Sequence, residues 1–225
     1  MTTSDDLRKI PRIEPYRMPT VSDLPPNVAK WEVDPDRAVL LIHDMQKYFV
    51  AALPRDASPT NELIANTTRL LEGCRSAGVP VAYTAQPGGM SENERGLLRD
   101  VWGPGMAIDP EHREIIDPLR PTSDDWVFTK WRYSAFHRND LLPFLRLYKR
   151  DQIVLCGIYA HVGVMITACE AFTNDIETFL VGDAVADFSA WHHRTALEWS
   201  ALRCAVVCTT DSVLGRLDSA TENAA

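Results

Sequence analysis

A buried strand that ends in an acid is the feature that most restricts the fold of this chain. Residues 38–42 form an unbroken apolar run, which His43 and Asp44 end abruptly. A run of this length, bounded by polar residues, is typical of a strand buried on both faces of a parallel sheet. Open α/β sheets bind their ligands beyond the carboxyl ends of such strands. Asp44 is therefore a candidate functional residue, although an isolated Asp here is more often a turn or capping residue.

Strand and helix patterns alternate along the rest of the chain. Apolar runs predict further strands at about 79–84, 126–130, 153–160, 176–181 and 205–208. Apolar residues at helical spacing predict helices at about 61–78, 141–148, from 162 onward and 191–203. Such alternation implies right-handed crossovers between parallel strands. The sequence therefore predicts an α/β fold with a mostly parallel six-stranded sheet and helices on both faces.

The chain is expected to form one domain with an arm and a tail. Residues 1–37 contain six prolines, which fix φ and remove a donor, so they predict an extended arm. Residues 38–217 form the domain, and the polar residues 218–225 are expected to be flexible. Residues 91–126 are irregular, and a loop of this length tends to be functional. The apolar residues of the arm could pack on the domain or on a second subunit; they are Ile10, Ile13, Tyr16, Met18 and Trp31.

Charge and cysteine content narrow the classes of function. The net charge of −8 argues against a nucleic-acid partner and against an anionic membrane surface. No apolar run approaches the roughly 18 residues that span a bilayer, and the N-terminus lacks the apolar core of a signal peptide. The five cysteines form no C-x-x-C pair, so reduced thiols in a cytoplasmic protein are expected. The sequence contains no metal-binding motif, and no cofactor is implied.

Polar residues end several of the expected strands. Asp44, Gln86 and Lys130 each come at the end of a different strand. Because the carboxyl ends of parallel strands share one edge of a sheet, these side chains are expected to converge on one crevice. Many α/β enzymes have this pattern, so it does not define a reaction by itself.

Six ordered motifs resemble one known family. They are LLIHDMQKYF (40–49), YTAQPGGM (83–90), WGPGM (102–106), TKWRYSAFHRNDL (129–141), GIYAHVGVM (157–165) and DAVADFS (183–189). From about residue 10 to residue 217, the chain resembles the isochorismatase branch of the cysteine-hydrolase superfamily. The resemblance implies a Rossmann-like sheet with a catalytic acid, lysine and cysteine. Asp44 matches the acid and Lys130 the lysine, but the position of the cysteine nucleophile is Val164.

Valine at position 164 changes the implied mechanism. Valine cannot attack a substrate, and Cys156 and Cys169 are expected to be small buried hydrophobic residues. A valine here resembles the phenazine-pathway member of the family, which hydrolyses the enolpyruvyl ether of 2-amino-2-deoxyisochorismate to pyruvate and trans-2,3-dihydro-3-hydroxyanthranilate. Protonating the terminal carbon of a vinyl ether needs a general acid but no nucleophile. Asp44 is expected to be that acid and Lys130 to bind a substrate carboxylate, although Lys130 could also be a solvated charge.

Further site residues follow from the same resemblance. It implies substrate contacts from Gln86 and Tyr159, a carboxylate clamp from Arg95, pocket walls from Trp102 and Tyr133, and a backbone N–H donor from Gly163. Arg95 could instead be a surface residue, and Trp102 and Tyr133 could be ordinary core residues. The family also implies a non-proline cis peptide bond, which would join Tyr159 and Ala160. The histidines at positions 43, 161, 192 and 193 are expected to be structural.

The implied ligand is a dianion derived from chorismate. A protein of net charge −8 needs a locally positive pocket for it, made by Lys130, Arg95 and helix N-termini. The function could be the hydrolase just described, an isochorismatase giving 2,3-dihydro-2,3-dihydroxybenzoate for a siderophore, or binding without catalysis. No carrier-domain motif follows residue 217, which favours the first function. A homodimer is expected from the resemblance and from the need to seat the arm.

Overall fold

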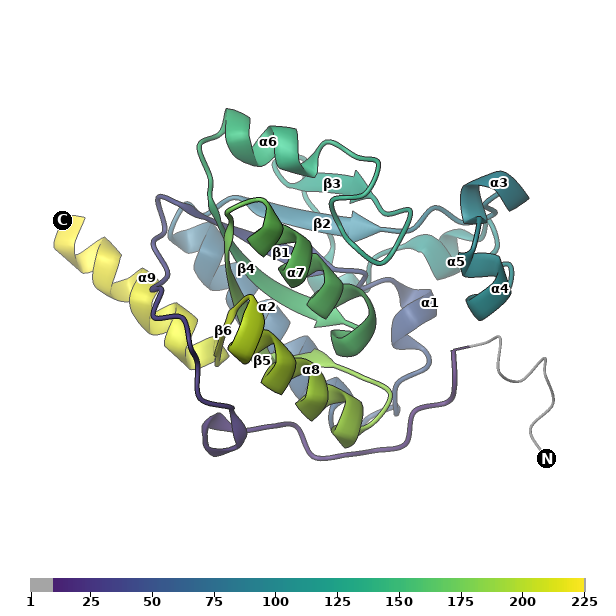
Figure 1. Cartoon of the computed structure of the whole chain (residues 1–225), viewed down its shortest axis with the longest axis horizontal. Coiled ribbons are helices and arrows are strands. Elements are labelled where there is room, and N and C mark those ends of the chain that lie inside the picture. Colours follow the sequence, from purple (N-terminus) through teal and green to yellow (C-terminus); the bar gives the residue numbers. More distant parts are fainter. Residues whose placement is uncertain (1–9, 225) are drawn as a thin grey trace.

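One parallel sheet forms the centre of the molecule (Figure 1). The computed structural model describes residues 10–224, in which six strands pair in the order β3-β2-β1-β4-β5-β6, each parallel to its neighbours. The strands are β1 (Ala38–His43), β2 (Val81–Ala85), β3 (Trp126–Thr129), β4 (Gln152–Ile158), β5 (Glu177–Ala186) and β6 (Val206–Cys208). The predicted α/β fold is confirmed, and the parallel pairing includes every strand in this range.

Helices cover both faces of the sheet. α2 (Thr60–Ser76) and α9 (Thr210–Ala224) pack on one face. α6 (Leu141–Leu147), α7 (Met165–Thr173) and α8 (Ala190–Arg203) pack on the other. The sheet therefore separates two apolar cores. Within residues 10–224 no helix has the length and the apolarity that crossing a membrane would require.

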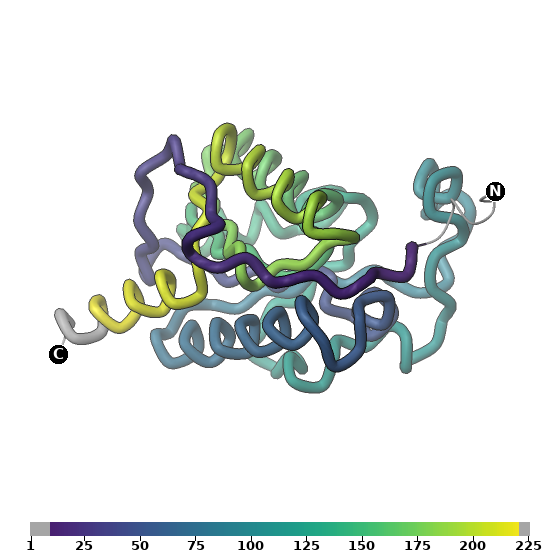
Figure 2. Tube along the Cα trace, turned by 90° about the horizontal axis from the view of Figure 1, so that it is seen from below, coloured from purple at the N-terminus to yellow at the C-terminus, as the bar shows by residue number. Residues whose placement is uncertain are grey.

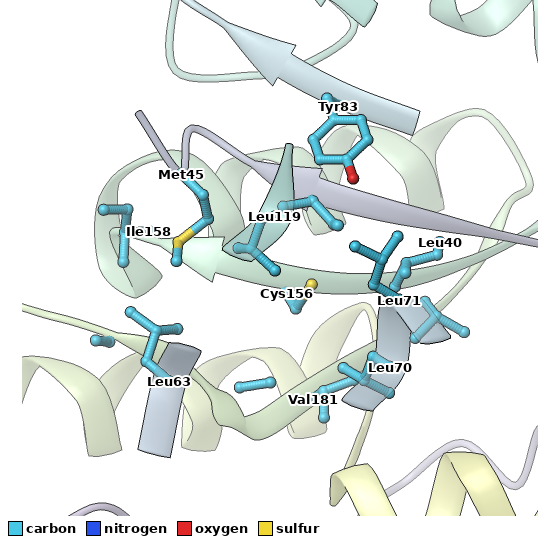
Figure 3. Packing of buried hydrophobic residues seen from close by; sticks show 14 of the residues in the cluster. Leu40, Met45, Leu63, Leu70, Leu71, Tyr83, Leu119, Cys156, Ile158 and Val181 are labelled. Carbon is cyan, nitrogen blue, oxygen red and sulfur yellow. The ribbon is translucent and has the colours of Figure 1, made fainter. Parts of the chain in front are cut away.

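Strand β1 supplies side chains to both cores because it lies between β2 and β4. All six of its residues are buried, with Leu40 and Ile42 on the α2 side and Val39 and Leu41 on the α7 side. Figure 3 shows the first of these cores, in which Leu40 lies near leucine side chains of α2. Burial on both faces explains why this strand is a continuous apolar run in the sequence.

The N-terminal arm packs on its own chain. Ile13 and Met18 are buried in the core on the α2 side, and Ile13 N donates to Ala52 O at 3.0 Å. Figure 2 shows the arm running along the molecule between the helices of the two faces. Near its end, the Asn27 amide donates to Val207 O at 2.9 Å and accepts from Val207 N at 2.7 Å. The arm thus covers the edge of β6, and seating it requires no second subunit.

The segment expected to be an irregular loop contains short helices. They are α3 (Glu92–Arg95), α4 (Leu98–Trp102), α5 (Pro110–Arg113) and the 3-10 turn η3 (Asp117–Leu119). Figure 1 shows α3, α4 and α5 beyond the carboxyl ends of the strands, together with α1 (Lys47–Val50). Such short polar helices have almost no apolar periodicity, which is why the sequence pattern did not predict them.

The chain is helical up to Ala224, whereas residues 218–225 were expected to be flexible; residue 225 lies outside the described residues. α9 continues to Ala224, and its Val213 and Leu217 are buried in the core on the α2 side. The sequence did not predict this helix because its last residues are mostly polar, and an amphipathic helix needs few apolar positions to pack on a core.

The turn after β4 differs from the expectation in detail. β4 ends at Ile158 and a wide π-helical turn, η4 (Ala160–Val164), leads into α7. The cis peptide bond lies between Ile158 and Tyr159, one residue earlier than expected, at the point where the chain leaves the strand. β5 also extends beyond its expected end at Val181, because it pairs again with β4 at Gly157 and Ile158 after a register shift.

Candidate active site

One pocket lies beyond the carboxyl ends of β1, β2 and β3. α3 and α4 contribute to it from the outside, and the turn after β4 forms another side. Every residue that the sequence proposed for catalysis or substrate binding lines this pocket: Asp44, Gln86, Arg95, Trp102, Lys130, Tyr133, Tyr159 and Gly163. The shared edge of the parallel sheet brings together side chains from distant parts of the chain.

A buried ion pair lies at the base of the pocket. Lys130 Nζ is 2.8 Å from Asp44 Oδ2, and the Thr84 hydroxyl donates to Asp44 Oδ1 at 2.7 Å. The side chains of Asp44 and Lys130 are only 6% and 3% exposed, so Lys130 is not a solvated charge. Protein groups therefore hold both carboxylate oxygens of Asp44.

The backbone at Asp44 directs the carboxylate toward Lys130. Asp44 has a φ of 52°, in the left-handed region that Asp tolerates better than most residues. Its N–H donates to Thr84 O at 3.2 Å, which ties this turn to the end of β2. A non-glycine residue in this conformation at a pocket is typical of functional sites.

Two opposing effects set the pKa of Asp44. Burial raises it, while the charge of Lys130 and the hydrogen bonds from Lys130 and Thr84 lower it. Burial is the largest single effect, but the lowering effects together outweigh it, and the pKa of Asp44 lies below its ordinary value. Asp44 is therefore a carboxylate at neutral pH and must gain a proton before it can act as an acid.

His43 is a buried neutral neighbour of this pair. Its Nδ1 lies 2.8 Å from Ile158 O, so Nδ1 carries the hydrogen. Burial lowers the pKa of His43 to about 4, and its contact with Asp44 at 3.8 Å is therefore not an ion pair. The ring packs on Gly163, where any Cβ would collide with it. This position suits the structural role expected for His43.

Arg95 is buried and has no acidic partner among the described residues. It is 6% exposed, and its Nε donates to Gly103 O at 3.0 Å while Nη1 donates to Gln86 Oε1 at 3.3 Å. The alternative that Arg95 lies on the surface is therefore wrong. A buried guanidinium without a carboxylate is suited to bind one from a ligand.

Gln46 was not predicted, yet it positions Gln86. The fully buried Gln46 accepts from Gln86 N at 2.8 Å and donates to Gln86 O at 2.9 Å and to Arg113 O at 2.7 Å. One amide thus joins the end of β2 to α5. The signal available in the sequence was a polar residue two positions after Asp44.

Aromatic side chains form much of the pocket wall. Trp102 Nε1 donates to Tyr133 Oη at 2.8 Å, and Tyr159 Oη donates to Phe49 O at 2.6 Å. Phe188, which was also not predicted, packs edge-on against Tyr159 and Trp102 with centroid distances of 4.8 and 5.9 Å. These rings lower the local dielectric, which strengthens the electrostatic interactions of the charged groups.

The turn that carries Gly163 binds its own polar groups. The N–H groups of residues 162–164 all point toward Tyr159 O at 3.1–3.2 Å, and Asp187 Oδ2 accepts from His161 N at 2.7 Å. An N–H bond from Gly163 to a substrate, as predicted, would require the bond to Tyr159 to be shared or broken. The Asp187 carboxylate also offsets the positive charge expected at this helix start.

No thiol replaces the missing nucleophile. Val164 is fully buried at the start of α7, and none of the five cysteines, all within the described residues, lines the pocket. The side chain of Cys156, in β4, lies in the core on the α2 side of the sheet (Figure 3), where burial raises the pKa of its thiol. Cys169 lies farther along α7 and is partly buried.

The fold and the site define a class of enzyme. A parallel sheet presents a buried acid–lysine pair at its carboxyl edge, and Val164 occupies the position where a nucleophile would follow. Residues 10–224 contain no cluster of three His, Cys, Asp or Glu side chains placed to bind a metal. The arrangement is that of a hydrolase of the cysteine-hydrolase type that has no thiol at the position of the nucleophile.

Comparison with known proteins identifies the family. The isochorismatase domain matches residues 38–212. Phenazine biosynthesis protein PhzD1 of Pseudomonas aeruginosa is 57% identical over 205 residues, which cover 91% of this chain and 98% of that protein. The isochorismatase of Bacillus subtilis is 55% identical over 211 residues, 94% of this chain and 68% of that one. The chain belongs to the isochorismatase family, as its motifs indicated.

Solved structures support the same assignment. A cysteine hydrolase from Pseudomonas syringae pv. phaseolicola superposes with a TM-score of 0.77 at 28% identity and covers 87% of this chain and 99% of its own. The N-carbamoylsarcosine amidase of Thermoplasma acidophilum gives 0.66 at 28% identity, with coverages of 78% and 97%. The protein is thus a hydrolase of this family in which valine replaces the expected cysteine.

Proposed function

We propose that the protein hydrolyses the enolpyruvyl ether of 2-amino-2-deoxyisochorismate to pyruvate and trans-2,3-dihydro-3-hydroxyanthranilate. The observation that carries the proposal is an intact Asp44–Lys130 pair in a protein that has a buried valine at position 164. The pair can supply a proton, whereas valine offers no route to a covalent intermediate. The 57% identity to a phenazine biosynthesis protein supports a role in the synthesis of a phenazine-like metabolite.

The reaction needs one acid and one water. Protonated Asp44 gives its proton to the terminal methylene carbon of the vinyl ether, which leaves an oxocarbenium ion and a carboxylate. Water adds to the oxocarbenium carbon and returns a proton to Asp44. The resulting hemiketal collapses to pyruvate and the ring alcohol, as the proton of its hydroxyl passes to the departing oxygen. Asp44 ends as it began, and the sum is the consumption of one water.

Substrate binding supplies the conditions that protonate Asp44. In the structure the charge of Lys130 lowers the pKa of Asp44. A substrate carboxylate competes for the Lys130 ammonium and adds a negative charge, and both effects raise the pKa of Asp44. Lys130 therefore has two roles in this proposal, as a ligand for the carboxylate and as the group that releases Asp44.

Parallel rate measurements test the function. Pyruvate release is followed with 2-amino-2-deoxyisochorismate and with isochorismate, and kcat/KM is expected to be higher for the amine. A reaction without protein serves as the blank for spontaneous hydrolysis. If neither of the two ethers released pyruvate, the hydrolase would be rejected and a binding protein would be favoured.

A second candidate is an isochorismatase that gives 2,3-dihydro-2,3-dihydroxybenzoate for a siderophore. It is favoured by the 55% identity to the isochorismatase of Bacillus subtilis and by the 44% identity to enterobactin synthase component B of Escherichia coli. The two substrates differ in one ring substituent, an amine or a hydroxyl. A higher kcat/KM for isochorismate in the same measurement would favour this candidate.

We also propose a homodimer and a cytoplasmic location. Exposed apolar side chains on the adjacent helices α7 and α8, such as Phe172 and Trp199, support self-association. Five free thiols support a reducing compartment. Sedimentation equilibrium would test the dimer, because its mass would be twice the 25.2 kDa of one chain.

A further inference from the structure

We infer that Arg132 binds one carboxylate of the substrate while Arg95 binds the other, so that this pair of guanidinium groups selects dianions. The inference rests on the proposed function, because it concerns the same pocket and a ligand with two carboxylates. Arg132 follows β3, two residues after Lys130, and it was not among the residues proposed from the sequence.

The charges of the pocket point to two anionic groups. Its charged lining residues are Asp44, Lys130, Arg95 and Arg132. In the free protein Lys130 is neutralised by Asp44, whereas neither arginine has a carboxylate partner among the described residues. Two positive charges therefore remain without compensation in the free protein. Each can bind one carboxylate of the proposed substrate, and one of these carboxylates also competes for Lys130.

The two arginines are close enough to affect each other. Burial lowers the pKa of Arg95, and the charge of Arg132 lowers it further. Arg95 is buried and Arg132 is half-buried. Like charges this close repel each other, and an anion bound between them relieves that repulsion. A ligand with two carboxylates is therefore favoured over a neutral or monoanionic one.

Arg132 is fixed in place by the backbone. Its Nη1 donates to Glu94 O at 2.7 Å and to Trp131 O at 2.6 Å. These bonds orient the guanidinium and engage only one of its nitrogens, so the rest of the group can donate to a carboxylate. Because Glu94 precedes Arg95 in α3, the same bonds could also serve only to brace that helix. The experiment must distinguish binding of a substrate carboxylate by Arg132 from stabilisation of α3 by Arg132.

Three stable aryl ethers make that separation possible. 3-(1-Carboxyethoxy)benzoate carries both carboxylates, 3-ethoxybenzoate only the ring carboxylate, and 2-phenoxypropanoate only the side-chain carboxylate. All three lack the vinyl group, so calorimetry measures their binding without turnover. Arg132→Gln should weaken the diacid and one of the monoacids by about tenfold to hundredfold, the usual range for a charged hydrogen bond. Arg95→Gln should weaken the diacid and the other monoacid.

The pattern of losses decides between the two roles. If Arg132 only braces α3, Arg132→Gln will weaken the same monoacid as Arg95→Gln, and the inference is overturned. Unchanged affinities in Arg132→Gln with normal pyruvate release would also overturn it while leaving the proposed function intact. If the wild type bound the diacid no more tightly than the monoacids, there would be no dianion site and the inference would be overturned, while pyruvate release would still test the proposed function.

Two controls accompany the panel. Arg194→Gln removes an exposed arginine of α8 that does not line the pocket, so it should bind all three ligands normally. Arg132→Lys keeps the charge but not the planar fork, and it is expected to restore part of the affinity lost in Arg132→Gln. A complete lack of rescue by lysine, with an unchanged thermal midpoint, would contradict a charge-based role.

Discussion

At the scale of single residues, the central question is how an acid held as a carboxylate can donate a proton. Asp44→Ala removes the acid and leaves Lys130 without its partner. We expect pyruvate release to fall by about 100-fold or more, the usual contribution of a general acid. Dianion binding should persist or tighten, because a negative charge has left the pocket. The loss of turnover is measured as the rate of pyruvate release, and binding is measured by calorimetry.

The matched control is Asp100→Ala, which removes an exposed carboxylate of α4 outside the pocket. It should leave both turnover and binding unchanged. Substantial turnover by Asp44→Ala would show that another group delivers the proton.

The lowered pKa of Asp44 also predicts a pH profile. Because the free enzyme holds Asp44 ionised above a depressed pKa, the protonated fraction falls as the pH rises. With isochorismate, which has no amine to titrate, kcat/KM should fall about tenfold per unit between about pH 5 and pH 8. The residual activity of Asp44→Ala should lack this slope. A profile that rises with pH would instead indicate a general base.

The same residues show what a sequence can and cannot predict about a site. Asp44, Gln86 and Lys130 were found because strand ends are visible as breaks in apolar runs, and parallel strands bring them together. Gln46 and Arg132 were not found, because their roles depend on which loop segment folds over the strand ends. That packing leaves no periodic signal in the sequence.

At the scale of elements, the arm is attached to the active-site turn by a directional chain of hydrogen bonds. His193 Nε2 lies 2.9 Å from Gly182 O, so Tyr16 Oη donates to Nδ1 at 3.1 Å and accepts from Asp187 N at 2.8 Å. Asp187 in turn accepts from the ring of His161 at 2.6 Å. The arm therefore helps to position the turn that forms one side of the pocket.

Tyr16→Phe tests this attachment. The change leaves two buried polar groups without a partner, so the free energy of unfolding should fall by about 1–3 kcal/mol in urea titrations. Tyr148→Phe, at a tyrosine that is 51% exposed, should cost much less. Equal stabilities for the two variants would mean that the arm is not fastened at Tyr16.

Elements differ in how well the sequence predicts them. Strands buried on both faces were located to within a few residues, because their apolar runs have clear ends. α9 and the helices between β2 and β3 were not expected, because short or polar helices are stabilised by caps and tertiary contacts rather than by a long apolar stripe. The Ser91 cap of α3 and the Asp109 cap of α5 are examples.

At the scale of the whole molecule, the net charge and the pocket charge have opposite signs. The chain carries a net charge of −8, yet Lys130, Arg95 and Arg132 outnumber Asp44 in the pocket. Local cations within an apolar wall dominate the potential there, because their interactions are poorly screened. Composition therefore argues against extended anionic partners without arguing against a small anionic ligand.

The distribution of all five cysteines predicts the response of the molecule to thiol reagents. Burial raises the pKa of Cys74, Cys204 and Cys208 to about 12, and the thiol of Cys156 is shifted in the same direction. Thiols with raised pKa values react slowly because the thiolate is the nucleophile. Native protein treated with iodoacetamide should therefore keep most of its activity, and mass spectrometry should find little labelling at these four positions. In urea all five should react, which controls for reagent quality. Rapid inactivation that parallels the labelling of a single cysteine would contradict a site without sulfur and restore the covalent route.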